Sequence, residues 1–467
     1  MSIQRIALSA ANLQPRADYR VQKSVQNRNV SDFNCAEMSS AASLAIRNNY
    51  MSNISFKGIN NDSANNTVGL KKSIKDLEDI KGKRALVRVD INVPLDENKN
   101  VTDDTRIQAI RPTIDYLKDK GAKIVLMAHL GRPKGQRNEE YSLKPVAEYM
   151  SDLFGEEVVF IPDIKDAPEM VANLKEGQIA LLENIRFYKA EEAKNDDMTF
   201  AKELAQLGDF YVNDAFGAAH RNHTSTAKLA EVLKPAVSGL LMEKEIRCLS
   251  QALENPERPF TAVVGGSKVS SKIGVLENLL DKVDNLIIGG GMAYTFVKAN
   301  GGEIGNSLCE DDQIDVARAI MKKAEEKGVN LIFDTDVLAT DDFSGNGTTK
   351  IVKIDEIPEG FMGVDSGIES REKFANVLKS SKTILMNGPV GVFENPKFSK
   401  GTQSVLAAIV EATKNGATSV IGGGDSVAAA KQFQDADDFT HVSTGGGASL
   451  EFIEGKVLPG VDALDDI

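Results

Sequence analysis

Short apolar runs that end in chemically distinctive residues recur along this chain, and they constrain its fold more than any other feature. Each run is bounded by turn-forming residues and followed by a helical pattern, which is typical of parallel strands in βαβ units. Ligands of open α/β sheets bind outside the carboxyl ends of the strands. The sequence therefore predicts parallel sheets whose strand ends carry the functional residues.

The kind of residue at these strand ends changes halfway along the chain. Arg, His, Asp and Asn end the runs in 86–92, 124–132, 180–186 and 210–221. Glycines end the runs in 263–266, 286–291, 420–424 and 442–447. We therefore expect two α/β lobes with different binding edges, one rich in side-chain cations and the other offering backbone N–H groups.

The domain organisation follows from where this alternation starts and stops. Residues 1–67 are rich in Asn and Ser without sustained periodicity, which predicts a disordered N-terminal extension. Its basic, acid-poor start is typical of an organellar transit peptide, and a non-functional extension explains it equally well. We expect a first domain over 68–250 that includes a helical stretch from Ala227 to Leu253, a second domain over 255–447 and a tail, 448–467, that returns to the first domain.

Composition excludes several classes of protein. The net charge of -13 argues against a nucleic-acid binder, because such a protein needs a basic face. No apolar stretch is long enough to span a bilayer, so no membrane partner is expected. The three cysteines form no CxxC pair, which favours reduced thiols in a cytosol-like compartment over a disulfide framework or zinc site.

A glycine-rich strand end near residue 422 predicts an anion site. Three glycines precede Asp425 and Ser426, either of which can cap the helix that follows. Converging N–H groups and the helix dipole favour an anion there. Asp425 would oppose a bare phosphate but suits a Mg²⁺ ion carried by a nucleotide. A tight βα turn explains one such loop alone, whereas four glycine-ended strands in one lobe favour phosphate or nucleotide binding.

Two lysines four residues apart, Lys268 and Lys272, follow another glycine-ended run. On the first turn of a helix both would face the same way, where they could neutralise a phosphoryl group. A solvated lysine pair is the alternative. The chain has neither GxxxxGK[ST] nor a GxGxxG that opens a helix after a strand, so the common nucleotide fingerprints are absent.

The strand ends of the first half predict a small, multiply anionic substrate. Arg side chains match phosphate and carboxylate oxygens bidentately, and Asp90 and Asn92 could contact hydroxyl groups. His220 and His223 could indicate a metal site, but no carboxylate-rich neighbourhood supports one, so a structural or substrate-contacting role is favoured. The cationic candidates are Arg106, His129, Arg132, Arg186, His220 and Arg221.

Taken together, these motifs resemble those of phosphoglycerate kinase from about residue 73 to the end. The matching segments are 87–94, 129–133, 182–187, 213–221, 264–269, 289–293, 387–394, 422–426 and 443–448. The resemblance implies two Rossmann-like parallel-sheet domains joined by a helix, with the active-site cleft between them. The chain departs from the family pattern at Ser366 and Ile368, which puts the rigidity of loop 365–370 in doubt, and at Met386, where many members have Trp.

The resemblance also implies an activity. Such an enzyme transfers a phosphoryl group reversibly between 1,3-bisphosphoglycerate and MgADP, giving 3-phosphoglycerate and MgATP by direct in-line transfer when the cleft closes. It is a glycolytic kinase with Mg²⁺ as cofactor, and we expect a cytoplasmic monomer. An organellar, plastid-like location is the alternative if residues 1–67 act as a transit peptide.

Each residue that matches a family motif acquires an implied role. The phosphoglycerate would contact Asp90, Ile91, Asn92, Arg106, His129, Leu130, Gly131, Arg132, Arg186 and Arg221. The nucleotide would contact Gly266, Lys268, Gly291, Gly363, Asn387, Val392, Glu394, Gly423, Gly424, Asp425 and Ser426. Transfer itself would involve Arg106, Lys272, Gly424 and Gly447, and Asp425 would reach the metal through the nucleotide.

Two other classes of protein share parts of this pattern. A two-lobed solute-binding protein also has paired α/β domains, but the start of this chain has no apolar export signal. A dinucleotide-dependent dehydrogenase is disfavoured because the GxGxxG fingerprint is missing.

Overall fold

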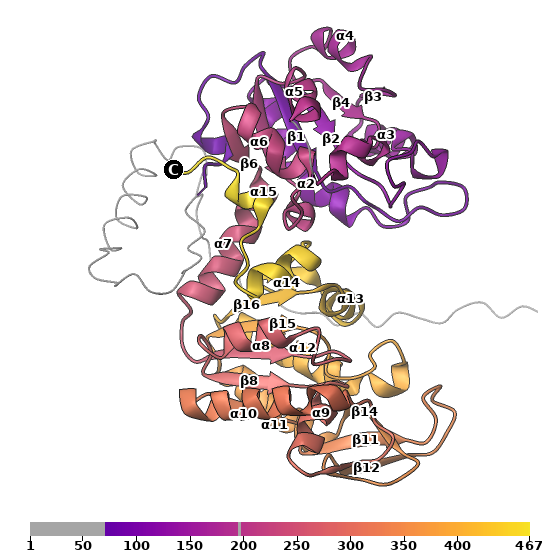
Figure 1. Cartoon of the computed structure of the whole chain (residues 1–467), viewed down its shortest axis with the longest axis vertical. Coiled ribbons are helices and arrows are strands. Elements are labelled where there is room, and N and C mark those ends of the chain that lie inside the picture. Colours follow the sequence, from indigo (N-terminus) through magenta and orange to yellow (C-terminus); the bar gives the residue numbers. More distant parts are fainter. Residues whose placement is uncertain (1–70, 195–197) are drawn as a thin grey trace, which may run out of the picture. The chain divides into compact units, whose positions relative to one another are not determined.

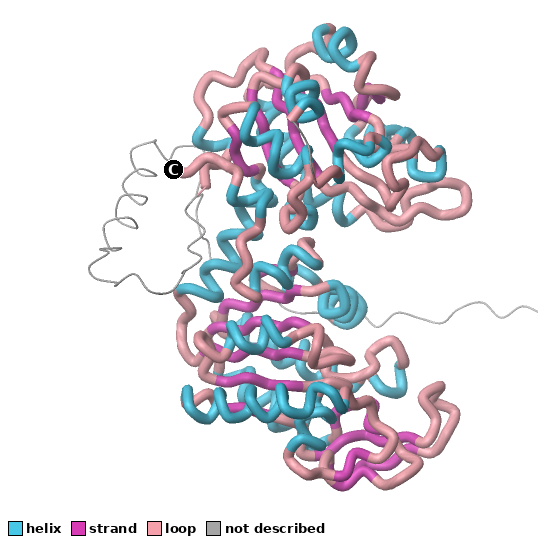
Figure 2. The backbone as a smooth tube through the Cα atoms, in the orientation of Figure 1, coloured by secondary structure: helices cyan, strands magenta, loops and turns pink. Residues whose placement is uncertain are grey.

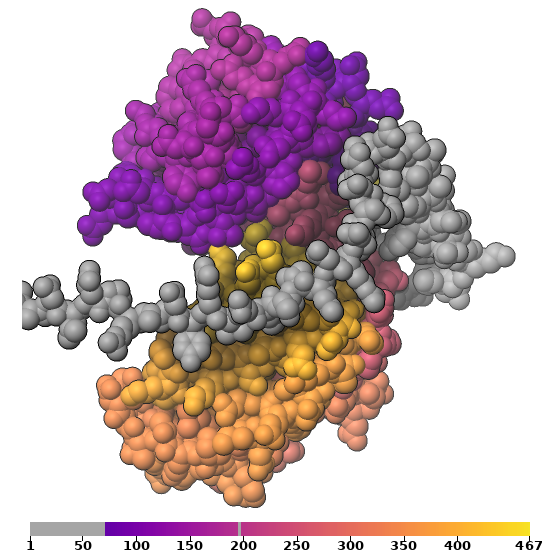
Figure 3. Space-filling view, turned by 180° about the vertical axis from the view of Figure 1, so that it is seen from behind, coloured from indigo at the N-terminus to yellow at the C-terminus, as the bar shows by residue number. Residues whose placement is uncertain are grey.

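The computed structural model describes residues 71–194 and 198–467. The predicted extension over 1–67 lies outside the described residues. The described chain forms two lobes, each built on its own parallel sheet (Figure 1). Each lobe is one block of the sequence colours in Figure 3, so each comes largely from a continuous stretch of chain.

The first sheet has six parallel strands in the order β3-β4-β2-β1-β5-β6. The strands are β1 (Arg84–Val89), β2 (Lys123–Met127), β3 (Val158–Ile161), β4 (Ile179–Leu182), β5 (Phe210–Asp214) and β6 (Ala236–Ser238). The helices around them are α2 (Thr105–Asp119), α3 (Lys144–Phe154), α4 (Ala167–Ala172), α5 (Thr199–Ala205) and α6 (Leu229–Val232). Helix α7 (Leu240–Glu254) then leads to the second lobe.

The second sheet has six parallel strands in the order β10-β8-β7-β15-β16-β17. These are β7 (Phe260–Val264), β8 (Asn285–Ile288), β10 (Asn330–Ile332), β15 (Thr383–Asn387), β16 (Thr418–Gly422) and β17 (His441–Val442). Its helices are α8 (Ile273–Leu279), α9 (Ala293–Ala299), α10 (Ile314–Lys327), α11 (Ile368–Ser380), α12 (Lys400–Lys414), α13 (Gly424–Phe433) and α14 (Gly447–Ile453). Numbered along the lobe, the strand order is 3-2-1-4-5-6, which defines a doubly wound sheet.

Smaller elements complete the described chain. An antiparallel sheet joins β11 (Asp336–Thr340), β12 (Thr349–Lys353) and β14 (Met362–Ser366), and β9 (Glu303–Ile304) pairs with β13 (Glu356–Ile357). The last helix is α15 (Pro459–Asp462). The short helical turns are η1 (Ile74–Asp76), η2 (Glu139–Tyr141), η3 (Ile185–Phe187), η4 (Lys189–Glu192), η5 (Phe216–Ala218), η6 (Thr224–Lys228), η7 (Asp311–Gln313), η8 (Pro396–Phe398) and η9 (Ala436–Asp438).

Helices cover both faces of each sheet, because alternate residues of a strand point to opposite faces. In β1, Val87 packs into the core beneath α2 and α3, whereas Leu86 packs into the core beneath α4, α5 and α6. In β7, Ala262 packs with α8 to α10 and Val263 with α11 to α13. Figure 2 shows the magenta strands of the second lobe between cyan helices. These buried layers explain why the strands read as continuous apolar runs.

The prediction of a helical stretch from Ala227 to Leu253 is wrong between Val232 and Leu240. Helix α6 ends at Val232, and β6 adds a strand to the sheet before α7 begins. Pro235 explains the break, because proline has no N–H to donate and disfavours a helical backbone at the residue before it. The stop predicted at 255–259 coincides with the end of α7 at Glu254.

The C-terminal residues contact the first lobe. Asn213 Nδ2 donates to Gly460 O (2.9 Å), and Gly460 N donates to Ala219 O (2.8 Å). Farther along, Asp465 accepts a hydrogen bond from Ala236 N (3.0 Å), and its carbonyl accepts one from Lys72 N (2.8 Å). These bonds join the chain after α14 to β5 and β6.

Helix α7 is hydrogen-bonded to both lobes. Asp214, at the end of β5, caps the helix by accepting hydrogen bonds from Leu241 N and Met242 N (both 3.0 Å). Burial raises the pKa of Asp214 to about 6. One turn on, Glu245 accepts from Thr444 N (2.7 Å) in the second lobe. In 71–194 and 198–467, no helix is both long and apolar enough to cross a membrane.

Candidate active site

The first candidate site lies where the strand order of the first sheet reverses, between β1 and β5. This is the position at which doubly wound sheets bind ligands. Asp90 directly follows β1 and is buried, and Arg106 on α2 donates to its Oδ2 (2.8 Å). Gly217 follows β5, and a side chain there would meet Asp90, since a Cβ would lie 2.5 Å from Oδ2. The sequence prediction that these strand ends meet is therefore correct.

Hydrogen bonds tie three strand ends of the first sheet together. Asn92, after β1, accepts a hydrogen bond from Gly131 N (2.9 Å) after β2. Arg186, after β4, donates to Gly131 O (2.9 Å) and pairs with Glu192 (3.0 Å). Gly131 itself has φ +60°, and a Cβ would lie 2.4 Å from the Tyr141 ring, so only glycine fits. The result is a rigid loop cluster around a buried guanidinium.

Arg88, within β1, holds His129 in one tautomer. Its side chain is fully buried, and it donates to Ser225 Oγ (2.9 Å), to Val89 O and to His129 Nδ1 (3.1 Å). A guanidinium can only donate, so Nδ1 must accept and neutral His129 carries its proton on Nε2. The sequence analysis did not single out Arg88. A charged residue inside an apolar strand could have indicated that Arg88 has a buried partner.

The histidines of this site are held neutral by their surroundings. Burial lowers the pKa of His129 well below its usual value, and the charges of Arg88, Arg186 and Arg106 lower it further. Burial, followed by Arg186 and Arg221, lowers the pKa of His223 to about 3. Arg88 and Arg186 act on both rings, which places one cation from β1 and one from the turn after β4 near both histidines.

One carboxylate is buried beneath these cations. Glu191 in η4 is fully buried and accepts hydrogen bonds from Ser225 N (2.9 Å) and Ser225 Oγ (2.6 Å). Burial raises the pKa of Glu191, and Arg88 opposes that shift. Glu191 therefore links Ser225, and through it Arg88, to the loop after β4. The sequence analysis missed this residue, because it lies in a short turn without a motif.

The other candidates of the first lobe differ in exposure. Ile91 and Leu130 have buried side chains, so only their backbone groups could contact a ligand. Arg132 is exposed, while His220 and Arg221 are half-buried. Burial lowers the pKa of His220, and Arg221 lowers it further. Within 71–194 and 198–467, no group of three or more His, Cys, Asp or Glu side chains is placed to hold a metal ion.

The second candidate site lies at the reversal point of the second sheet, between β7 and β15. The loops after these strands pack backbone against backbone. A Cβ on Gly265 would lie 2.0 Å from Pro389 O, and one on Gly388 would lie 2.0 Å from Gly265 O. Gly290, after β8, has φ +70°, and a Cβ there would lie 2.9 Å from Gly266 O. Close packing therefore explains part of the glycine pattern without any ligand.

Other glycines at this edge face open space. A Cβ on Gly424 would have no atom within 4 Å, and one on Gly447 would meet only the His220 ring, at 3.6 Å or more. Gly423 has φ +87° and lies beside the buried amide of Asn387. The Nδ2 atom of Asn387 has no hydrogen-bond partner among the described residues. An unused donor next to open glycine backbone is the arrangement expected of an anion site.

Lys272 reaches the same place from the loop after β7. Its Nζ donates to Asn387 Oδ1 through a short hydrogen bond. Burial lowers the pKa of Lys272, whereas the carboxylates of Asp425 and Glu454 raise it. The expected placement of Lys268 and Lys272 on one helical turn is wrong. Helix α8 begins only at Ile273, so Lys268 lies in the loop with an exposed side chain.

The predicted cap of the next helix is also wrong. Gly423, rather than Asp425 or Ser426, is the N-cap residue of α13, because its positive φ lets the helix begin at Gly424. Ser426 is buried and accepts a hydrogen bond from Gly388 N, which joins this helix to the loop after β15. Asp425 stays exposed in the first turn. One exposed carboxylate beside open glycine backbone has the chemistry to hold a Mg²⁺ ion that a nucleotide would bring with it.

The remaining nucleotide candidates lie on neighbouring loops. Gly291 lies close to Leu308, and Gly363 leaves room for the Tyr294 ring. Val392 N donates to Val364 O (2.9 Å), and Glu394 is exposed.

The segment 365–370, expected as a loop, is a junction of strand and helix. Ser366 ends β14, and Ile368 begins α11 with an exposed side chain. Asp336 fixes the start of α11, where it accepts a hydrogen bond from Ser370 N (2.8 Å). The substitutions that raised doubt about rigidity therefore lie at a capped helix start.

Three buried carboxylates, Asp334, Asp336 and Asp365, interact with one another in the second lobe. Burial raises the pKa of Asp334 to about 7, and the charges of Asp365 and Asp336 raise it further. Burial also raises the pKa of Asp365 to about 7, although Gly401 N donates to both of its oxygens (3.0 Å each). No ion pair of Asp334 is found among the described residues. The sequence analysis missed this cluster, because its members are far apart in the chain.

Fold and site together define a two-domain α/β protein that presents guanidinium groups at one sheet edge and open backbone with a lysine at the other. The family model of phosphoglycerate kinase matches residues 74–456. The structure of phosphoglycerate kinase from Coxiella burnetii is similar, with 42% identity and a TM-score of 0.78, over 84% of this chain and 98% of that one. The enzyme from Pyrococcus horikoshii has 33% identity and a TM-score of 0.71 over the same shares. The chain belongs to the phosphoglycerate kinase family.

The contact between Arg88 and His129 predicts how His129 titrates. Replacing Arg88 with Met removes a cation next to the ring, so the pKa of His129 should rise, while burial keeps it below its usual value. Arg88→Lys keeps the charge and should raise it less. ¹⁵N NMR of the imidazole would measure both the pKa and the tautomer, with Arg111→Met on the surface of α2 as control. An unchanged pKa and tautomer in Arg88→Met would contradict this account.

The buried Asp334 predicts a pH dependence of stability. Its folded pKa of about 7 exceeds the usual 3.8, so the native state holds a proton that the unfolded state releases. The free energy of unfolding should therefore fall as the pH rises from about 4 to about 7. Asp334→Asn removes this contribution, so its stability relative to wild type should increase over that range by on the order of 2–4 kcal/mol.

Urea unfolding of both proteins at several pH values would measure this difference. Asp315→Asn is the matched control, because that side chain is 94% exposed. A stability difference between Asp334→Asn and wild type that does not vary with pH would show that Asp334 is ionised throughout.

Proposed function

We propose that this chain catalyses reversible phosphoryl transfer between 1,3-bisphosphoglycerate and MgADP, giving 3-phosphoglycerate and MgATP. The main support for the proposal is that one chain has two different candidate sites, each at the point where the strand order of its sheet reverses. One gathers guanidinium groups and neutral histidines, and the other combines Lys272, the unpartnered Asn387 amide and open glycine backbone. Membership of the family supports the same reaction.

The first site has the chemistry to bind phosphoglycerate. Arg106 is oriented by its ion pair with Asp90, and the exposed Arg132 and half-buried Arg221 supply further cations. Neutral His129 would donate from Nε2 to a carboxylate or phosphate oxygen. Asp90 and Asn92 would bind the hydroxyl group, and backbone groups of Ile91, Leu130 and Gly131 would complete the contacts.

The second site has the chemistry to bind a nucleotide. Gly423, Gly424 and the first turn of α13 offer backbone N–H groups to phosphate oxygens. Lys268, Gly266 and Gly291 would line the phosphate side. Gly363, Val392 and Glu394 would contact the nucleoside, with Glu394 at the ribose. Mg²⁺, when bound with the nucleotide, would neutralise phosphate charge, and Asp425 would hold it.

The transfer step needs no general base. The attacking oxygen, on ADP or on the carboxylate of phosphoglycerate, is already ionised, so the chain has to orient the reactants in line and stabilise charge. Arg106, Lys272 and the backbone N–H groups of Gly424 and Gly447 would donate to the phosphoryl oxygens in flight. Closure of a cleft between the two domains, which would exclude water, is part of this proposal.

Compartment and assembly belong to the proposal too. We propose a monomer in the cytoplasm, with an organelle as the alternative if residues 1–67 direct the chain there. N-terminal sequencing of the mature protein would distinguish the two locations. A direct test of the activity is a coupled assay with ATP, Mg²⁺ and 3-phosphoglycerate, in which a full-length chain without turnover would overturn the assignment.

Loss of a cation at the transferring group should affect turnover strongly. Arg106→Ala and Lys272→Ala should each lower kcat by on the order of 100-fold or more, because each removes a donor that acts in the transition state. Lys322→Ala on the exposed face of α10 is a matched control that should keep wild-type turnover. Near wild-type kcat in both site variants, each with an unchanged unfolding midpoint, would count against their roles.

Loss of Asp425 should affect use of the magnesium nucleotide. Asp425→Ala should raise KM for MgATP by about tenfold, equal to about 1.4 kcal/mol of binding, and leave KM for 3-phosphoglycerate nearly unchanged. Initial rates over a Mg²⁺ titration would measure this, with Asp315→Ala as control. Unchanged KM and kcat for MgATP would refute the role of Asp425.

A further inference from the structure

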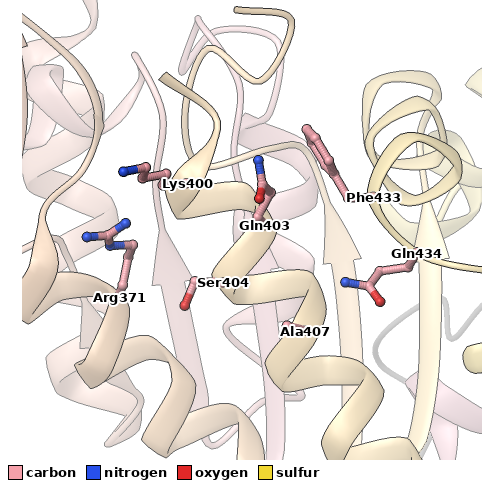
Figure 4. Close-up of a pocket in the computed structure, with 7 residues that line it drawn as sticks. All are labelled: Arg371, Lys400, Gln403, Ser404, Ala407, Phe433 and Gln434. Atoms are coloured by element: carbon pink, nitrogen blue, oxygen red, sulfur yellow. The ribbon is translucent and has the colours of Figure 1, made fainter. Parts of the chain in front are cut away.

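A groove of about 490 Å³ lies on the second lobe, and none of the candidate residues above lines it. It runs along α12 between α11 and the end of α13 (Figure 4). Three of the residues that line it, Lys400, Gln403 and Ala407, are exposed, so the groove is shallow and open to solvent. The lining residues are Arg371, Lys400, Gln403, Ser404, Ala407, Phe433 and Gln434.

One end of the groove is cationic. Arg371 and Lys400 both line it, and no carboxylate does. Figure 4 shows the two side chains extending to the same side of α12. Arg371 donates from Nε to Gly367 O (3.1 Å), which aims its guanidinium and leaves both terminal nitrogens available.

The carboxylate that interacts with Arg371, Asp365, does not neutralise this pair. Asp365 interacts electrostatically with Arg371, but both of its oxygens accept hydrogen bonds from Gly401 N inside the lobe. Among the described residues, Lys400 Nζ has no hydrogen bond or ion pair. Two neighbouring cations without a matched anion, on a chain of net charge -13, are what an anionic ligand would neutralise.

The other end of the groove offers a ring face and amide groups. Phe433 is half-buried against the core of the lobe, which fixes its ring, and Gln434 extends its amide toward α12. Gln403 donates from Nε2 to Ser399 Oγ (2.8 Å), so its Oε1 is left to accept. A flat ring can stack on Phe433, and amides supply both donors and acceptors at its edge.

We propose that this groove binds a phosphorylated heterocycle. The phosphate lies between Arg371 and Lys400, with Ser404 as an additional donor. The ring lies against Phe433, where Gln403 and Gln434 contact its polar edge. None of these residues belongs to the proposed catalytic site, so binding in the groove is independent of the proposed reaction.

Pyridoxal 5′-phosphate with borohydride is a suitable probe, because it combines a phosphate, a flat heterocycle and an aldehyde. The Lys400 amine condenses with the aldehyde and releases water, and borohydride then delivers hydride to the C=N carbon while water protonates the nitrogen. Peptide mapping of the full chain assigns the label residue by residue, so binding at any other site does not interfere.

Lys400 should be labelled about tenfold faster than the exposed Lys322, a ratio that corresponds to specific binding rather than exposure. Arg371→Ala and Phe433→Leu should each reduce that ratio toward one. Lys379→Ala, on α11 but outside the groove, should not change it. AMP should protect Lys400 at about one tenth of the concentration of inorganic phosphate needed.

Labelling of Lys400 at the rate of Lys322 would overturn the proposal, and so would labelling that Arg371→Ala leaves unchanged. If AMP and inorganic phosphate protect Lys400 equally, or if Phe433→Leu does not change the labelling of Lys400, the groove binds an anion and does not recognise a heterocycle. If Arg371→Ala fails to fold, Arg371→Gln and the AMP competition in the wild-type chain decide the same question.

Discussion

The second site depends on the close contact of two loops at the point where the strand order reverses. Gly265 and Gly388 approach until neither could carry a Cβ, and this fixes β7 against β15 at their carboxyl ends. Asn387 is held at the end of β15 by that contact, and Lys272 and Gly423 are placed against its amide. The donors of this site are therefore positioned by backbone packing, which leaves them little freedom to rearrange.

Both candidate sites present hydrogen-bond donors to an anion, but they use different chemical groups. The first uses guanidinium and imidazole side chains whose orientation comes from buried partners, Glu191 and Ser225 under Arg88 and Asp90 beside Arg106. The second uses backbone N–H groups exposed by glycine. Both sets are held by neighbouring groups of the chain, an arrangement that would limit the local reorganisation needed to bind an anion.

The sequence predicted the strands and the gathering of the candidate residues at their ends, because parallel strands bring their carboxyl ends to one edge whatever lies between them. It could not predict the role of Arg88, since β1 is buried on both faces and the apolar pattern does not say which way a residue points. It missed Glu191 and Asp334 because their partners are distant in the chain. It also misplaced the start of α13, where the positive φ of Gly423 decides the boundary. Pro235 indicates a helix break, but the helical pattern of the residues around it led to the prediction of a continuous helix.

The neutral histidines of the first site affect how its charge changes with pH. His129 and His223 lose their charge far below neutrality, and guanidinium groups keep theirs at any physiological pH. The histidines of this site therefore add no charge when the pH falls below neutrality. Asp214 and Glu191 have raised pKa values, so these two buried carboxylates gain protons more readily than exposed ones. Any pH sensitivity in the capture of an anion would then come from those carboxylates or from the protons of the anion itself.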